Sequence, residues 1–397
     1  MTVTTTNSAA HDVDPFSDAF LTDPYPGHAL VRESGPVVHL DRYGIWATGR
    51  HDVVRRALLD PGTFCSGAGV GISDFRKEPP WRPPSLLLEA DPPEHTRARR
   101  VVAGVLSAAA MRRLEERFSE AADAIVAPLA RSGPFDAMAE LAIAYPLSVF
   151  ADAVGLPVAG RENLLAYARM VFNTFGPRNE RFTAALADAG PTRDWIAAHC
   201  LPENLSPDGM GAQIHARAAA EGFTRDEAAM LVRSFLSAGV DTTVHGLGNA
   251  LWCLATHPDQ FARLRADPAL ARGAFEEVLR FEAPVQTFFR TTTSAVDVDG
   301  VALEAGSKIL LLLAAANRDP RQWTDPDTFD IGRPVTGQLG FGFGIHVCVG
   351  MAMARLEGTA VLEALARHTT AVSLAGAPDR MLNNTLRGFA RLPLQVA

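Results

Sequence analysis

The sequence predicts a mainly α-helical protein with a smaller β portion. Long segments repeat apolar residues at helical spacing, strand-like alternation is confined to a few short segments, and 47% of the 397 residues are hydrophobic, enough for a large core. The expected helices, in order, are 95–114, 113–131, 136–154, 160–175, 179–200, 224–256 and 270–281. Strands are expected at 37–49 and 308–313, with a short hairpin at 297–306. We expect a mobile tail over residues 1–15 and one domain over residues 16–397.

The segment 224–256 is the longest of the expected helices. Thr224 and Glu227 have the spacing of a capping box, and roughly nine helical turns follow them. The middle of the segment nevertheless reads AGVDTT, in which glycine, aspartate and threonine each disfavour helix by up to ~1 kcal/mol relative to alanine. We therefore expect this stretch to serve something other than helix stability.

Charge and cysteine content exclude several classes of protein. The chain has 37 basic and 45 acidic residues, a net charge of -8, which argues against a nucleic-acid-binding protein. Its four cysteines have neither the spacing of a disulfide framework nor that of a zinc site, as expected in the cytoplasm. The N-terminus lacks the apolar core of a signal peptide, and the longest apolar run, 309–316, is too short to span a bilayer. We therefore expect a cytoplasmic protein without membrane attachment.

One cysteine, Cys348, lies in the glycine-rich stretch FGFGIHVCVG at residues 341–350. One interpretation of Cys348 is purely structural, as a small hydrophobic residue buried in a turn. We interpret Cys65, Cys200 and Cys253 as structural residues of this kind. The stretch resembles the haem-ligand loop of the cytochrome P-450 superfamily, the haem-thiolate monooxygenases. The resemblance implies the P-450 fold, a triangular-prism helical domain plus a small β-rich domain, with haem b (iron protoporphyrin IX) as cofactor and Cys348 as the axial ligand of its iron. Glycines let such a loop pass close to a flat cofactor, and a thiolate ligand favours O–O cleavage.

Haem carries two propionates, which need cationic or hydrogen-bonding partners when buried. By the same resemblance, the partners here would be His95, Arg99, Arg290 and His346. Each of these side chains, taken singly, is also compatible with a solvated surface position.

A structural network is implied by EEVLR, in which Glu277 and Arg280 stand three residues apart on one helix and can pair. Such pairs are common on helix surfaces and mean little alone. In the resembled family the matching pair fixes the segment leading to the cysteine, together with an arginine before the haem loop. We assign that third role to Arg333, although Thr328 stands where many relatives have arginine and Arg333 can be read as a surface residue.

The AGVDTT stretch resembles the oxygen-activation segment of the family. Ala238 and Gly239 would let the helix run over the haem face and leave room for O2. Asp241 would be the acid that takes protons from solvent, and the Thr242 hydroxyl would relay them to dioxygen. The alternative is a helix kink at which Thr242 bonds back to a preceding carbonyl.

Several stretches, WRPPSLLLEADPP, AYPLSVF, LVRSFLSAG and QTFFRTTT, resemble a narrower group of bacterial enzymes that oxidise para-substituted benzoates, including methoxybenzoates. A carboxylate in an apolar pocket needs charge-assisted partners, for which Arg82, Ser85 and Ser234 are candidates and Arg233 an additional one. The flat apolar slot for the ring would be formed by Leu88, Phe172, Phe175, Val285, Phe288 and Leu386. Simple core packing explains the phenylalanines equally well, and a solvated loop position explains Arg82.

The function implied by the resemblance is that of a monooxygenase that inserts one atom of O2 at the para substituent of a small aromatic carboxylic acid, by hydroxylation or O-demethylation. Electrons would come singly from NAD(P)H through a separate ferredoxin reductase and a ferredoxin, which would dock near Arg97, Arg100, Arg112 and Arg113. Two alternatives stay open, a peroxide-driven peroxygenase and a non-catalytic haem-binding sensor. The Asp241–Thr242 pair argues against the peroxygenase, because peroxide needs no machinery to protonate dioxygen.

Overall fold

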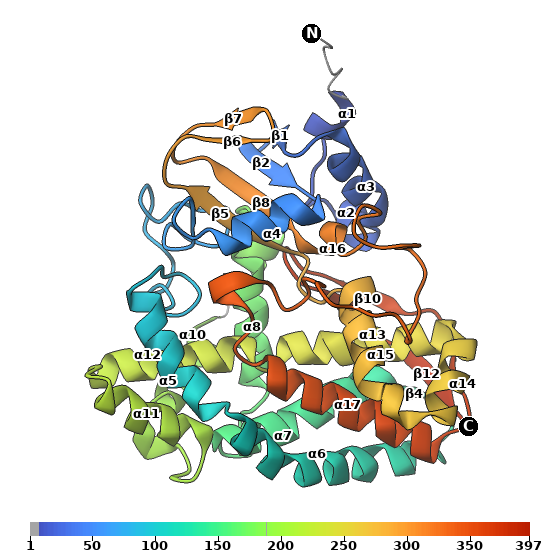
Figure 1. The fold of residues 1–397 in the computed structure, drawn as a ribbon. Coiled ribbons are helices and arrows are strands. Elements are labelled where there is room, and N and C mark those ends of the chain that lie inside the picture. Colours follow the sequence, from blue (N-terminus) through green and yellow to red (C-terminus); the bar gives the residue numbers. More distant parts are fainter. Residues whose placement is uncertain (1–7, 188) are drawn as a thin grey trace.

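The computed structural model describes residues 8–187 and 189–397 of the chain, and its helices and strands separate into two parts (Figure 1). A small β-rich part contains the N-terminal helices, and a larger part is mainly helical but also holds the sheets β4-β12-β9 and β10-β11. The glycine-rich loop 341–350 lies where the two parts meet, directly before α17 (Met351–His368). The expected fold class, mainly helical with a smaller β portion, is confirmed.

The β-rich part is centred on a five-stranded sheet of order β1-β2-β8-β5-β3. A tight hairpin joins β1 and β2, and β2 then pairs in parallel with β8, with Trp46 opposite Ile309. The β6–β7 hairpin turns at Asp299 and Gly300, both with positive φ, which is the geometry that a two-residue Asp-Gly turn favours. The strands are β1 (Val38–Leu40), β2 (Ile45–Thr48), β3 (Phe64–Cys65), β4 (Phe135–Asp136), β5 (Thr287–Thr292), β6 (Val296–Val298), β7 (Val301–Leu303), β8 (Lys308–Leu312), β9 (Val372–Leu374), β10 (Asp379–Leu382), β11 (Arg387–Arg391) and β12 (Pro393–Val396).

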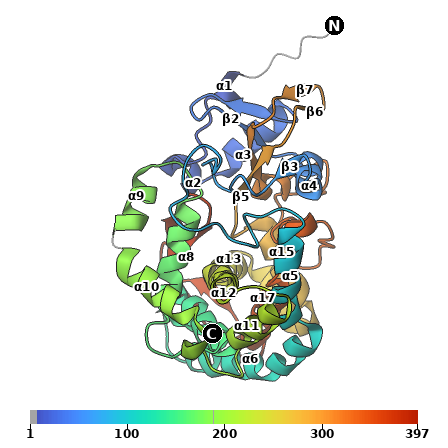
Figure 2. The ribbon, with the colours of Figure 1, turned by 90° about the vertical axis from the view of Figure 1, so that its left-hand side faces the viewer.

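The helical part packs around α12 and α13, which run through its middle and are seen nearly end-on in Figure 2. The side chains of α13 are buried along most of its length, as expected of a helix enclosed by others. The α-helices are α1 (Ser8–His11), α2 (Asp18–Thr22), α3 (Tyr25–Ser34), α4 (His51–Leu59), α5 (Glu94–Val105), α6 (Ala108–Leu129), α7 (Ala144–Val154), α8 (Asn163–Asn173), α9 (Glu180–Ala187), α10 (Ala189–His199), α11 (Met210–Ala220), α12 (Arg225–Ala238), α13 (Asp241–Thr256), α14 (Pro258–Ala266), α15 (Ala271–Phe281), α16 (Leu313–Ala316) and α17. Shorter turns are the π-helical η1 (Met138–Ile143) and the 3-10 turns η2 (Pro202–Asn204), η3 (Pro268–Leu270) and η4 (Gly344–His346).

The helix expected over 224–256 begins as predicted, because the Thr224–Glu227 capping box is present. It is not continuous, however, since α12 ends at Ala238 and α13 begins at Asp241. A Cβ on Gly239 would overlap the ring of Phe150, so glycine is required for α12 and α7 to approach this closely. The break falls in the AGVDTT stretch, whose residues disfavour helix.

Two further expectations are wrong. The helix expected over 95–114 ends earlier, because the hydroxyl of Ser107 accepts a hydrogen bond from the Ala110 N–H and starts α6 there. The expected tail over 1–15 includes residues 1–7, which lie outside the described residues, but from Ser8 onward the chain is folded. Ala10 is fully buried, and the His11 carbonyl accepts a hydrogen bond from the Asp41 N–H.

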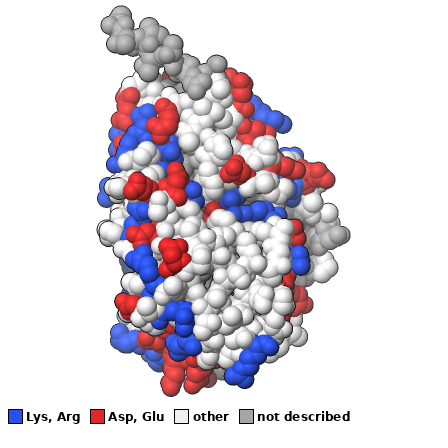
Figure 3. Space-filling model, turned by 90° about the vertical axis from the view of Figure 1, so that its right-hand side faces the viewer, with Lys and Arg blue, Asp and Glu red and all other residues white. Residues whose placement is uncertain are grey.

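The surface carries both charge signs. On the face drawn in Figure 3, basic and acidic side chains alternate down one edge and a broad area beside them is uncharged. Among the helices that the structure describes, none combines the length and the apolar character needed to cross a bilayer.

Candidate active site

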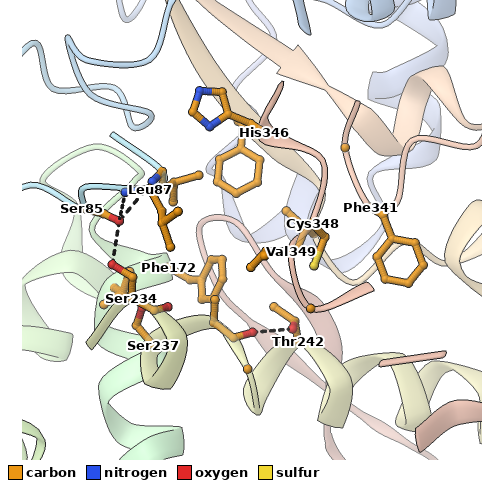
Figure 4. A pocket seen from close by; sticks show the side chains of 18 of the residues that line it. Ser85, Leu87, Phe172, Ser234, Ser237, Thr242, Phe341, His346, Cys348 and Val349 are labelled. Carbon is orange, nitrogen blue, oxygen red and sulfur yellow. Dashed lines mark hydrogen bonds between the residues drawn. The ribbon is translucent and has the colours of Figure 1, made fainter. Parts of the chain in front are cut away.

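A pocket lies between the helical part and the β-rich part, with the loop 341–350 as one wall and the α12–α13 junction as another (Figure 4). Most of the predicted site residues line it, although they come from segments far apart in the chain. They are Arg82, Ser85, Leu88, Arg99, Phe172, Phe175, Ser234, Ala238, Gly239, Thr242, Val285, Phe288, Arg290, His346 and Cys348. The predicted residues that do not line it are His95, Asp241, Glu277, Arg280, Arg333 and Leu386.

The Cys348 side chain points into the pocket, which is where its exposed surface lies (Figure 4). Burial raises the pKa of the thiol, while the N–H groups of Gly350 and Met351 and the nearby charges of Arg99 and Arg355 oppose that rise. A metal ion bound at the sulfur would deprotonate the thiol outright. The N–H groups at the start of α17 are then placed to stabilise the thiolate.

The loop that carries Cys348 depends on glycine at two positions with positive φ. Gly342 has φ +70° and Gly344 has φ +68°, a region that other residues adopt only under strain. Gly344 also passes so close to α4 that a Cβ would overlap the carbonyl oxygen of Leu58. The expected result for Gly344→Ala is a displaced loop and a lower thermal unfolding temperature, since both the strain and the overlap act there.

Gly342→Ala is the matched control for this prediction, because it adds the same strain without the overlap. The nearest atom to a Cβ at Gly342 is the His346 carbonyl oxygen at 3.7 Å. We expect Gly342→Ala to cost about 1–2 kcal/mol from the backbone conformation alone, and Gly344→Ala to cost clearly more. Equal unfolding temperatures for the two variants would contradict the packing argument.

Four basic side chains converge beside the cysteine loop from α5, β5 and η4. The rings of His95 and His346 have centroids 4.4 Å apart. Both nitrogens of His95 and Nε2 of His346 are buried, with no hydrogen-bond partner in the part of the chain that the structure describes. Arg290 is buried, donates to the Phe289 carbonyl at 2.8 Å, and has its pKa lowered to about 10 by burial. Within the described residues neither Arg290 nor Arg99 has an acidic ion-pair partner. Buried cations and orphaned donors of this kind require an anionic group, and two propionates fit that requirement.

The α12–α13 junction faces Cys348 across the pocket. The Thr242 hydroxyl donates to the Ala238 carbonyl at 2.9 Å, as expected where a threonine bonds back to a preceding carbonyl at a helix kink (Figure 4). The lone pairs of the hydroxyl oxygen stay free to accept a hydrogen bond. Asp241 does not line the pocket and is fully buried, so solvent does not reach its carboxylate directly.

A polar patch closes the end of the pocket away from Cys348. The hydroxyls of Ser85 and Ser234 lie 2.8 Å apart there (Figure 4). Arg82 forms an ion pair with the buried carboxylate of Glu89, at 2.9 and 3.2 Å, so its charge is already neutralised.

Arg233 differs from Arg82, because no acidic side chain of the described residues pairs with it. It lines the pocket, donates to the Pro83 carbonyl at 2.8 Å, and has its pKa lowered by burial. Arg233 is therefore the uncompensated cation at this end of the pocket.

Apolar side chains fill the space between the two ends. The rings of Phe172 and Phe175 meet edge to face at 5.7 Å, and Phe288 lies 5.9 Å from Phe175. Leu386 is buried behind them and pairs with Val285 in an isolated β-bridge. The lining also includes polar residues that were not predicted, among them Tyr167 and Ser237. Ser237 lies one turn beyond Ser234, a helical spacing that identifies it in retrospect.

The predicted ion pair between Glu277 and Arg280 is present, bidentate at 2.7 Å and fully buried. Arg333 approaches the same carboxylate at 3.3 Å. Arg280 also donates to the carbonyls of Asn317, Pro326 and Thr328, so this network ties α15 to the segment that leads to the cysteine loop.

Comparison with known proteins gives concordant results. Residues 202–395 match the family model described as Cytochrome P450. The chain is 55% identical over 385 residues to Cytochrome p450 CYP199A2 of Rhodopseudomonas palustris, covering 97% of this chain and 93% of that protein. It is 33% identical over 403 residues to a vitamin D(3) 25-hydroxylase of Pseudonocardia autotrophica, covering 99% and 98%. The structure of cytochrome P450 CYP109Q5 from Chondromyces apiculatus superposes with a TM-score of 0.82 at 28% identity, covering 98% and 99% of the two chains.

Proposed function

The chain belongs to the cytochrome P450 family of monooxygenases, and we propose that its substrate is a small aromatic carboxylic acid, oxidised at the substituent para to the carboxylate. The observation that carries this proposal is Arg233, which no acid of the described residues pairs with, beside the Ser85–Ser234 pair at the end of the pocket away from Cys348. A benzoate with its carboxylate at that end directs its para substituent toward the cysteine loop.

The energetics favour an anion over a neutral ring at the polar end. Burying a carboxylate without partners costs several kcal/mol, whereas each charge-assisted hydrogen bond returns ~1.5–3 kcal/mol. Arg233 and the two serine hydroxyls supply such bonds without breaking an existing ion pair. Arg82 would contribute indirectly, by keeping Glu89 neutralised so that the buried acid does not repel the substrate.

The family binds haem b, and we infer that Cys348 holds its iron while His95, Arg99, Arg290 and His346 hold its propionates. Bound haem supplies the redox chemistry that activates O2 and transfers one oxygen atom. The apolar side chains of Phe172, Phe175 and Phe288 would exclude water and orient the ring of the substrate. Asp241 would be the acid that supplies a proton, and Thr242 would accept this proton at Oγ1 and pass it on.

For electron supply we infer a ferredoxin and an NAD(P)H-dependent ferredoxin reductase. The predicted docking residues lie on α5 and α6, where Arg112 and Arg113 are exposed. Arg100 is paired with Glu221 at 2.9 Å, and Arg97 donates to the Glu221 carbonyl. Arg112 and Arg113 are therefore the more available contacts for an acidic partner.

The proposal is tested by titrating the ferric enzyme with para-substituted benzoates and following the spin-state change in its absorption spectrum. Arg233→Leu is expected to weaken 4-methoxybenzoate binding about ten- to a hundredfold, because it removes one charge-assisted hydrogen bond. The neutral analogue 4-methoxybenzamide has nearly the same shape, and its dissociation constant should hardly change in the variant. Equal losses for acid and amide would overturn the carboxylate anchor.

The Arg82–Glu89 pair provides a matched control. Arg82→Leu leaves the buried Glu89 carboxylate unpaired, so it should also weaken binding of the acid. In the double variant Arg82→Leu/Glu89→Leu no buried charge is left unpaired, and binding should recover if Arg82 acts only through Glu89. Binding that stays weak in the double variant would instead assign Arg82 a direct contact with the substrate.

A further inference from the structure

The Asp241 carboxylate is isolated from both solvent and the pocket. Its exposed fraction is 0%, and neither carboxylate oxygen has a hydrogen-bond partner among the described residues. Its neighbours Thr242 and Thr243 line the pocket, whereas Asp241 does not. The groups buried around Asp241 therefore decide how its carboxylate is held and how it exchanges protons.

His245, one turn further along α13, is the side chain that faces this carboxylate. Its Nε2 lies 3.5 Å from Oδ1 of Asp241, and its own side chain is 1% exposed. Both ring nitrogens are buried, and no residue that the structure describes forms a hydrogen bond with them. Within the described residues no lysine or arginine lies within 4.0 Å of Asp241, so His245 is the one basic group at ion-pair distance. A charge on either member alone would be costly at this depth, whereas a proton held between the two offsets that cost.

The surroundings of the imidazole hold it in place. Strand β11 crosses over the ring so closely that a Cβ on Gly388 would overlap Nδ1. The polar face of α13 continues one turn beyond His245 at Asn249, whose side-chain amide donates to the carbonyls of Glu282 and Arg387. Asp241, His245 and Asn249 thus form a buried polar row at intervals of four residues on α13, most of whose other buried residues are apolar.

We propose that His245 is a positioning residue that holds the Asp241 carboxylate and returns a proton to it after each donation. When Asp241 gives up its carboxyl proton toward Thr242, the neutral imidazole of His245 takes up a proton from water. The Nε2–H bond of His245 then breaks as an O–H bond forms on Asp241, so the pair is neutral before and after each donation. This inference rests on the proposed function, because it takes Asp241 as the acid. A purely structural His245 would only fill the space beneath β11.

The test compares His245→Gln and His245→Phe with the wild-type holoenzyme. Glutamine keeps an N–H donor but cannot take up an extra proton. Phenylalanine keeps an aromatic ring but has no N–H donor and no basic nitrogen. With 4-methoxybenzoate and a bacterial ferredoxin and reductase pair, both variants should slow NADH-driven turnover about 10- to 100-fold. This is at or below the smallest contribution typical of an acid–base group, because His245 acts through Asp241. The solvent deuterium isotope effect on that rate should rise, while the dissociation constant of 4-methoxybenzoate stays unchanged. His257→Gln, which alters another histidine at the end of α13, should leave rate and isotope effect as they are.

A second measurement needs neither substrate nor turnover. The imidazole nitrogens of His245 are followed by NMR in 15N-histidine-labelled ferric holoenzyme at neutral pH, with His245→Gln used to assign the signal. Asp241→Asn should shift the His245 nitrogen signals and leave those of the other ten histidines in place. Unshifted signals would overturn the pairing even if His245→Phe does not fold.

The outcomes separate this inference from the proposed function. If Asp241→Asn turns over with the wild-type rate and isotope effect, the acid role of Asp241 fails and this inference fails with it. If Asp241→Asn is slow while both His245 variants match the wild type, only the role of His245 is overturned. If 4-methoxybenzoate gives no spin-state change, the substrate proposal fails, and the NMR measurement still decides the pairing.

Discussion

Cys348→Ala is expected to abolish the strongly red-shifted Soret band that the reduced enzyme shows with carbon monoxide. That band requires a thiolate bound to the haem iron, and Cys348 is the one cysteine that lines the described pocket and would hold it. Alanine fits the same loop, because it removes only the sulfur and leaves the glycines and the Cys348–Phe341 backbone hydrogen bond in place. The loss should therefore be spectroscopic and catalytic, and not a loss of fold.

Cys200→Ala is the matched control for this result. Cys200 is buried at the end of α10, outside the pocket, and burial raises the pKa of its thiol to about 12, so it remains a neutral thiol. The variant should keep the band of the wild-type protein. A red-shifted band in Cys348→Ala would remove the thiolate assignment and return Cys348 to the interpretation of a small hydrophobe in a turn.

The sequence predicts local structure well where a short pattern of residue types determines it. The cysteine loop, the Thr224–Glu227 capping box and the Asp299–Gly300 turn are local patterns, because the residues that make each one are adjacent in the chain. The convergence of His95 with Arg290 and His346 also agrees with prediction, but that prediction came from family resemblance, since nothing local relates α5 to β5.

The sequence does not reveal how charges are paired across the fold. Nothing in the sequence distinguishes Arg82 from Arg233. Only the folded chain shows that Glu89 forms an ion pair with Arg82, whereas no acidic side chain of the described residues pairs with Arg233. The sequence likewise predicts one helix over 224–256 and does not reveal that it is divided into α12 and α13. The division depends partly on the close packing of Gly239 against Phe150 of α7, which lies far away in the chain. No sequence pattern identifies His245 as a site residue, because its role follows from being buried together with Asp241 in the folded chain.

Arg280→Leu is expected to have the largest effect on stability of any substitution outside the pocket. The variant leaves the Glu277 carboxylate fully buried, with only Arg333 at 3.3 Å as a cation, and it frees three backbone carbonyls. Removing one partner of a buried ion pair typically costs about 3–5 kcal/mol. Because the freed carbonyls belong to the segment before the cysteine loop, haem retention should fall together with the thermal unfolding temperature.

The double variant Glu277→Leu/Arg280→Leu separates the two contributions to that loss. It removes the stranded charge, so the part of the loss due to the unpaired carboxylate should be regained, while the part due to the carbonyls of Asn317, Pro326 and Thr328 remains. Arg333→Leu should cost less than Arg280→Leu, because Arg333 makes one longer contact to Glu277 and its other partners lie near the surface. Unfolding temperatures and haem content of the holoenzymes give the comparison directly. If Arg280→Leu unfolds at the wild-type temperature and retains its haem, the network does not hold the cysteine loop, and the loop's position must come from its glycines and from α17 alone.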